Sequence, residues 1–329
     1  MIGKIRNWLG LSGGGHRHGR HDQRGGAHGH SHGSHSHGIV EPSIATSERG
    51  IWAVKWSFAL LLATALVQAV IVFVSGSIAL LADTIHNLGD AGTAIPLWIA
   101  FVLARRKPSA RFPYGLGRVE DLAGVAVVLV ILFSAIVAGY EAVGRLLQPQ
   151  PVQQIGWVAI AGLIGFFGNE AVAVFRIRVG REIDSAALVA DGQHARADGL
   201  TSLAVVLGAA GVWLGYPLAD PIVGLLITGV IFAIVWQSAK AVFTRMLDGI
   251  DAAVLDELRH AAAREPRVKS VLGARARWIG HRLHGELTLA LDTSVSAREV
   301  TEIADTIRSH ARGHLPALER LVIEAMPAD

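Results

Sequence analysis

Two stretches decide the fold: residues 76–90 read GSIALLADTIHNLGD, and residues 187–198 read ALVADGQHARAD. Each ends in a histidine followed four residues later by an aspartate, within a run otherwise typical of a bilayer-spanning helix. The two pairs are His86 with Asp90 and His194 with Asp198. An ionisable residue at the bilayer centre costs about 2.5–3.5 kcal/mol on insertion scales, so four of them need compensation. Residues at i and i+4 share a helix face, so each pair can present an imidazole and a carboxylate to one shared cation.

The composition around these stretches favours a membrane protein. Hydrophobic residues make up 51% of the 329 residues. Spanning a bilayer core takes about 20 predominantly apolar residues per helix. We expect six spans, at residues 53–74, 78–103, 122–146, 155–175, 186–213 and 222–243. The two pairs then lie in the second and fifth spans, and two antiparallel helices supply four ligands.

Interhelical hydrogen bonding without a metal is the alternative for these four residues. Such bonds contribute about 0.6 kcal/mol each in membranes, well below the insertion cost of a carboxylate. We therefore favour a metal site.

The loop charges predict the orientation. Lys and Arg are absent from the loops at 75–77, 148–154 and 215–220. They gather after the even-numbered spans, at Arg105, Arg106, Lys107, Arg111, Arg176, Arg178, Arg181, Lys240 and Arg245. Because positive loops stay in the cytoplasm, we expect a multi-pass protein of the inner or plasma membrane with both termini cytoplasmic.

The first 50 residues differ from the rest of the chain. Gly, Ser, Arg and His dominate them, with histidines at His16, His18, His21, His28, His30, His32, His35 and His37. Their spacing is too irregular for a helix face, so we expect a disordered cytoplasmic tail. It is either a weak collector of divalent metal or a solvated segment of little consequence for turnover.

Residues 247–329 predict a small cytoplasmic domain of order αββαβ. A helix is expected at 251–265, strands at 267–278 and 283–291, a helix at 297–310 and a last strand at 318–325. This is half of a split βαβ, or ferredoxin-like, α+β arrangement with its helices on one sheet face. We expect it to serve dimerisation, giving a homodimer, or regulation. The tail, a transmembrane domain at 51–246 and this domain complete the chain.

From about residue 51 to 329 the chain resembles the cation diffusion facilitators, a family of six-span metal/proton antiporters. The specific pieces are the two quoted stretches and YGLGRVE at 114–120. The resemblance implies that the four residues of the two pairs are the metal ligands. It also implies supporting or helix-packing roles for Asp83 and Asp191, with direct ligation the alternative. Arg118 and Asp248 resemble a family charge pair that holds the membrane and cytoplasmic parts together.

The chain departs from the family at two further metal sites. Residues 115–117 read Gly-Leu-Gly where many members have a histidine-containing loop, and Thr288, Glu324 and Met326 replace histidines of the cytoplasmic domain. We expect neither site. Two other histidine pairs, His281 with His284 and His310 with His314, are candidates for an unrelated site, with solvated side chains as the alternative.

Ligand chemistry predicts the mechanism. Metal requires neutral imidazole and ionised carboxylate, so binding expels protons and protons expel metal. Two imidazoles and two carboxylates suit tetrahedral Zn²⁺, although Co²⁺, Ni²⁺, Fe²⁺ and Mn²⁺ remain alternatives. We expect no cofactor beyond the transported ion.

Other classes fit the sequence less well. A metal storage or sensor protein would explain the tail and not the membrane pairs. An intramembrane metalloprotease would need an HExxH helix, and none occurs. Without cysteines there are no disulfides or thiolate sites, and a net charge of +3 without a basic aromatic face disfavours nucleic acid.

Overall fold

The computed structural model describes residues 42–75, 84, 92, 94–147, 155–216 and 218–328. The histidines of the predicted tail, from His16 to His37, lie outside the residues that the structure describes. The helix α2 (Pro42–Ser75) begins inside the segment 1–50 that we predicted as tail. The first turns of this helix carry contacts to other elements, such as Glu48 with Arg105 at 3.0 Å, which a solvated tail would not make.

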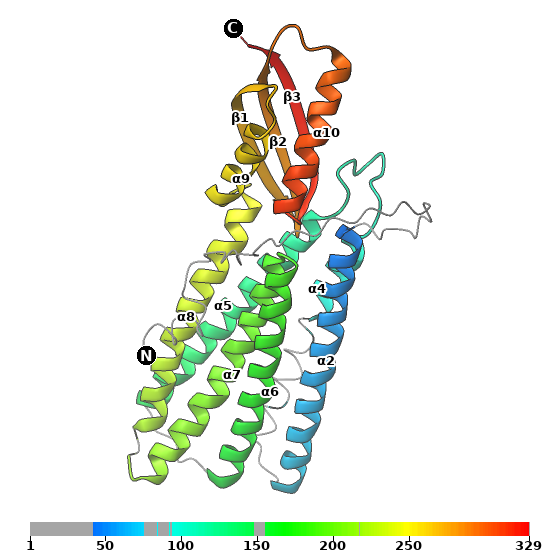
Figure 1. The fold of residues 1–329 in the computed structure, drawn as a ribbon. Coiled ribbons are helices and arrows are strands. Elements are labelled where there is room, and N and C mark those ends of the chain that lie inside the picture. Colours follow the sequence, from blue (N-terminus) through cyan, green and yellow to red (C-terminus); the bar gives the residue numbers. More distant parts are fainter. Residues whose placement is uncertain are drawn as a thin grey trace, which may run out of the picture. The chain divides into compact units, whose positions relative to one another are not determined.

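Five described helices are long and apolar enough to cross a membrane. They lie side by side in Figure 1: α2, α5 (Arg118–Leu147), α6 (Ile155–Glu182), α7 (Ala186–Trp213) and α8 (Ala219–Met246). The predicted second span is described chiefly at its end, where α4 (Ala94–Ala104) forms an 11-residue apolar helix. The predicted helical membrane domain is confirmed.

The helix α7 lies between α6 and α8 and is the most enclosed of the five (Figure 1). Buried residues make up 56% of an 18-residue apolar stretch of α7, against 22–33% of the corresponding stretches in the other four. Small residues permit this enclosure, because a Cβ added to Gly192 would lie 2.9 Å from the backbone nitrogen of Ile177 on α6. Close backbone approach through small residues is how membrane helices gain packing energy.

After α8 the chain forms the predicted αββαβ domain. Its elements are α9 (Ala252–Ala263), β1 (Val268–Ile279), β2 (Arg282–Leu291), α10 (Ala297–His314) and β3 (Leu318–Pro327). The strand β2 pairs antiparallel with β1 and parallel with β3, so β2, α10 and β3 form a βαβ unit.

Both helices of this domain pack on one face of its sheet (Figure 1). Leu283, Leu287 and Leu289 of β2 are at most 1% exposed against Leu258 of α9 and Ile307 of α10. The helix α10 begins with a capping box between Ser296 and Glu299, which satisfies its first backbone amides. The core of the domain is therefore separate from that of the membrane helices.

Candidate metal centre

His194 and Asp198 lie one turn apart on α7 and are almost completely buried. Their side chains are 1% and 6% exposed, and the imidazole Nδ1 lies 3.5 Å from the carboxylate Oδ2. At about 1.5 Å per residue, they lie about 12 and 18 Å along the helix from Ala186, well inside a hydrocarbon core of about 30 Å. One imidazole and one carboxylate thus face a common point within the bundle.

The predicted partner pair lies outside the described residues. This applies to His86 and Asp90, and also to Asp83. Among residues 42–75, 94–147, 155–216 and 218–328, no three His, Asp or Glu side chains gather as a metal site would require. The structure therefore describes two of the four predicted ligands.

Asp191 takes part in a buried ion pair. Its Oδ2 lies 2.8 Å from Nη1 of Arg176 on α6, and the two side chains are 0% and 1% exposed. Arg176 Nε also donates a 2.8 Å hydrogen bond to Ser57 Oγ on α2. These contacts join three helices, which agrees with helix packing as the role of Asp191.

A second pair joins α6 and α7 next to the predicted site. Arg196 donates to both carboxylate oxygens of Glu170, at 2.8 and 3.1 Å. Asn169, beside Glu170, is 4% exposed. Arg176 and Arg196 thus each pair with a carboxylate, whereas the carboxylate of Asp198 faces an imidazole.

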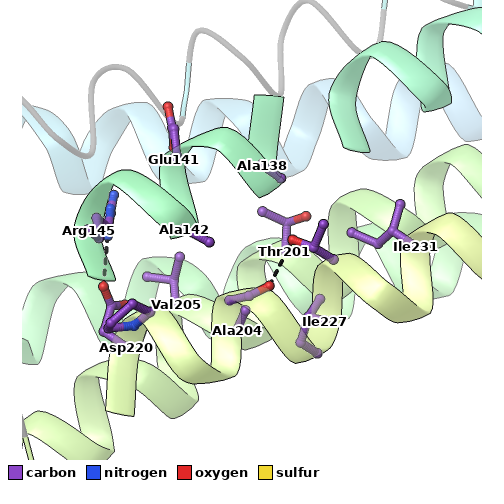
Figure 2. A pocket seen from close by; sticks show the side chains of 13 residues that line it. Ala138, Glu141, Ala142, Arg145, Thr201, Ala204, Val205, Asp220, Ile227 and Ile231 are labelled. Carbon is purple, nitrogen blue, oxygen red and sulfur yellow. Dashed lines mark hydrogen bonds and ion pairs between the residues drawn. The ribbon is translucent and has the colours of Figure 1, made fainter. Parts of the chain in front are cut away.

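A cavity of about 80 Å³ lies between α5, α7 and α8 (Figure 2). Thr201 and Val205 line it, and they follow Asp198 by three and seven residues on the same helix face. Arg145 and Asp220 form an ion pair at 3.1 Å in its wall, as Figure 2 shows. The cavity therefore continues the face of α7 that carries His194 and Asp198 toward the C-terminal end of the helix.

Arg118 at the start of α5 and Asp248 after α8 are brought into an ion pair. Arg118 also donates to the carbonyl oxygen of Arg245 at 3.4 Å, and Arg277 of β1 lies 3.9 Å from Asp248. The two paired side chains are 40% and 46% exposed, and exposed pairs contribute about 0–1 kcal/mol. The ion pair therefore connects the membrane helices to the start of the C-terminal domain and adds little to the stability of the fold.

The histidines of the C-terminal domain do not come together at one site. His281 contacts Glu120 at 2.6 Å, whereas His284 lies 3.6 Å from Glu319. His314 contacts Glu257 at 3.1 Å, and His310 is exposed on α10. His281, His284 and His314 thus each lie next to a different glutamate.

Glu319 illustrates how such a contact affects ionisation. Burial alone would raise its pKa, but the nearby imidazole of His284 and the charges of Arg282 and His281 hold the pKa below its ordinary value. The carboxylate therefore stays ionised at neutral pH.

Sequence reasoning missed the buried contact between Glu120 and His281. The two side chains are 161 residues apart in the chain and each 1% exposed. Glu120 ends the YGLGRVE stretch, and His281 follows Gly280 in the turn between β1 and β2. An acidic residue opening an apolar helix was the available signal, but nothing local identifies its partner.

Comparison with known proteins identifies the family of this chain. Residues 54–247 match a family model described as the cation efflux transmembrane domain. A "probable cation efflux system protein" of Mycobacterium tuberculosis is 52% identical over 298 residues, 90% of each chain. The zinc transporter ZitB of Escherichia coli is 28% identical over 261 residues, 78% of this chain and 80% of that one. A solved MamM CTD variant is 25% identical and covers 23% of this chain and 92% of that one, with a TM-score of 0.23.

Proposed function

Because this chain belongs to the cation efflux family of transporters, we propose that it exports Zn²⁺ from the cytoplasm in exchange for protons. The observation that carries the proposal is the buried pair of His194 and Asp198 on the most enclosed membrane helix. His86 and Asp90 are proposed to complete a four-ligand site from the second span. Four such ligands hold Zn²⁺ tetrahedrally, with Zn–N about 2.0–2.1 Å and Zn–O about 2.0–2.2 Å.

Proton exchange follows from these ligand types. Imidazole ordinarily titrates near pH 6.5, so small changes in its surroundings move protons on or off at physiological pH. Metal binding requires the neutral imidazole and the ionised carboxylate, and protons arriving from the other side reverse it. The same four groups thus serve the metal and the proton in turn.

The cavity of Figure 2 supports a route between this site and one side of the membrane. It begins one turn beyond Asp198, on the face of α7 that carries both ligands. Its other walls come from the end of α5 and the start of α8, the ends farthest along each helix from the C-terminal domain. Alternating access would close this route while opening another toward the cytoplasm.

Zinc is the preferred ion on ligand chemistry, and the similarity to a zinc transporter supports it. Co²⁺, Ni²⁺, Fe²⁺ and Mn²⁺ accept the same donors and are the alternatives. The positive loops support cytoplasmic termini, and we propose a homodimer joined in part by the C-terminal domain.

Metal-dependent proton flux in proteoliposomes tests this function. The purified chain is reconstituted with a pH-sensitive dye inside the vesicles and challenged with Zn, Co, Ni, Fe, Mn and Cd ions. We expect the largest proton flux with Zn²⁺, and equal flux after deletion of residues 1–41, which leaves α2 intact. Loss of all metal handling on that deletion would favour storage by the tail, and absence of flux with every ion would refute antiport.

A further inference from the structure

A buried polar cluster lies where the β1–β2 turn meets the ends of the membrane helices. His281 Nδ1 lies 2.6 Å from Glu120 Oε2 at the start of α5, and His281 Nε2 lies 3.1 Å from Ser47 Oγ on α2. Ser185 Oγ donates a 2.5 Å hydrogen bond to the other carboxylate oxygen of Glu120. One imidazole and one carboxylate therefore connect the C-terminal domain to three membrane helices.

The turn that carries His281 fits closely against these helices. Gly280 has a φ of +62°, and a Cβ there would lie 2.8 Å from Glu120 Oε2. Its amide donates to Asp121 Oδ2 at 3.3 Å, and Arg282 donates to the carbonyl oxygen of Ala104 at the end of α4 at 3.1 Å. Gly280 and His281 of the turn and Arg282, the first residue of β2, thus each contact α4 or α5.

Ser185 links this cluster to the metal pair. It is the N-cap of α7 and accepts a 3.1 Å hydrogen bond from the backbone amide of Leu188. Glu120 therefore holds the first turn of the helix that carries His194 and Asp198. A fully buried carboxylate is costly unless it is paired and hydrogen-bonded, so removing its imidazole partner should displace it.

We propose that His281 and Glu120 are positioning residues for transport, which keep the start of α7 at a fixed position relative to the C-terminal domain. This inference rests on the proposed function and adds a role for two residues that bind no metal. Loss of the His281 imidazole frees Glu120 to move, Ser185 loses its fixed partner, and the metal pair is less often in the transport-competent position. A shift of about 1 Å remote from a reacting centre can cost about a hundredfold in rate.

The test measures zinc flux per folded protein for variants of the full chain. We expect His281→Ala to lower turnover about tenfold while KM changes less than about twofold, because positioning acts after binding. His281→Asn keeps an N–H at the Nδ1 position and should recover most of the turnover. His310→Ala, at an exposed histidine of the same domain, is the matched control and should match wild type.

A distance measurement supplies a readout that does not depend on transport. The chain has no cysteines, so spin labels attach only where Leu214→Cys at the end of α7 and Ala263→Cys on α9 place them. We expect His281→Ala to broaden the label–label distance distribution without metal, and His281→Asn to leave it narrow.

Distinct results separate the two proposals. Wild-type distances and turnover in folded His281→Ala would overturn the positioning role, as would a His281→Asn variant no better than His281→Ala. If wild type transports no ion, the proposed function fails, and the distance distribution still decides whether His281 positions α7.

Discussion

Replacing Arg176 with methionine should strip the buried carboxylate of Asp191 of its charged partner. The two charges lie 2.8 Å apart with side chains at most 1% exposed. At an effective dielectric constant of about 20, that separation corresponds to about 6 kcal/mol of attraction, much of it offset by desolvation. Removing one partner of a buried pair typically costs about 3–5 kcal/mol, because the other charge remains buried. We expect a loss of that size for Arg176→Met.

Unfolding of the full chain in mixed micelles, titrated with SDS and followed by circular dichroism, measures this loss. Arg178→Met is the matched control, since Arg178 lies on the same helix and is exposed. The double variant Arg176→Met with Asp191→Leu should recover most of the stability, because apolar replacement of both partners is often neutral. A single variant within about 1 kcal/mol of the Arg178 control, or a double variant as unstable as the single, would refute the reasoning. Loss of zinc binding in a stable double variant would instead assign Asp191 to the metal site.

His86→Asp should admit Cd²⁺ or Mn²⁺ better, since it replaces an imidazole with a harder oxygen donor, and an unchanged ion profile in flux assays would contradict this. Arg118→Glu should impair transport or weaken the dimer, and adding Asp248→Arg should restore part of the loss. Flux assays and the dimer fraction in detergent measure both effects. A double variant no better than the worse single variant would contradict a role for the ion pair. Glu319→Gln should lower the unfolding temperature at pH 7, whereas Glu286→Gln, at an exposed residue of the same sheet, should not. Because folding lowers the pKa of Glu319, the ionised carboxylate stabilises the fold fully above the unfolded pKa of about 4.3, and this stabilisation fades as the pH falls below that value. A difference in unfolding temperature between Glu319→Gln and wild type that is the same at pH 7 and pH 3.5 would contradict this assignment.

The order of the described membrane helices was more predictable than their length. The expected span 155–175 corresponds to α6, which continues to Glu182, and the span 53–74 corresponds to α2, which begins at Pro42. Hydropathy identifies only the residues that lie in lipid, whereas backbone hydrogen bonding continues a helix into polar surroundings. The extensions carry contacts such as that of Ser47 with His281.

The strands of the C-terminal domain were predictable to within two residues at each end. The expected strand 283–291 corresponds to β2 (Arg282–Leu291), because alternation of apolar and polar residues marks a half-buried strand. The helix predicted at 297–310 ends later, at His314, because residues 312–314 are exposed and carry no apolar pattern that would mark them as helical. Periodicity therefore gave the order and type of these elements.

The role of His194 and Asp198 as metal ligands stays a prediction, but their closeness on α7 was predictable, because the two residues are four apart on one helix. The partner of Asp191 was not, since Arg176 lies on another helix and was read as a loop charge. The same holds for Glu120 and His281, whose contact depends on how the two domains meet. Spacing along the chain predicts which residues share a helix face, whereas contacts between residues far apart in the chain can be identified only in the folded structure.

Metal binding by single alanine variants tests the central claim most directly. Calorimetric titration of Zn²⁺ into His86→Ala, Asp90→Ala, His194→Ala and Asp198→Ala should show affinity lowered at least about a hundredfold, since even groups that only orient a ligand are worth about 10–100-fold. Gln193→Ala, at the buried residue beside His194, is the control and should bind as wild type does. Wild-type affinity in His194→Ala or Asp198→Ala would contradict a metal site on α7.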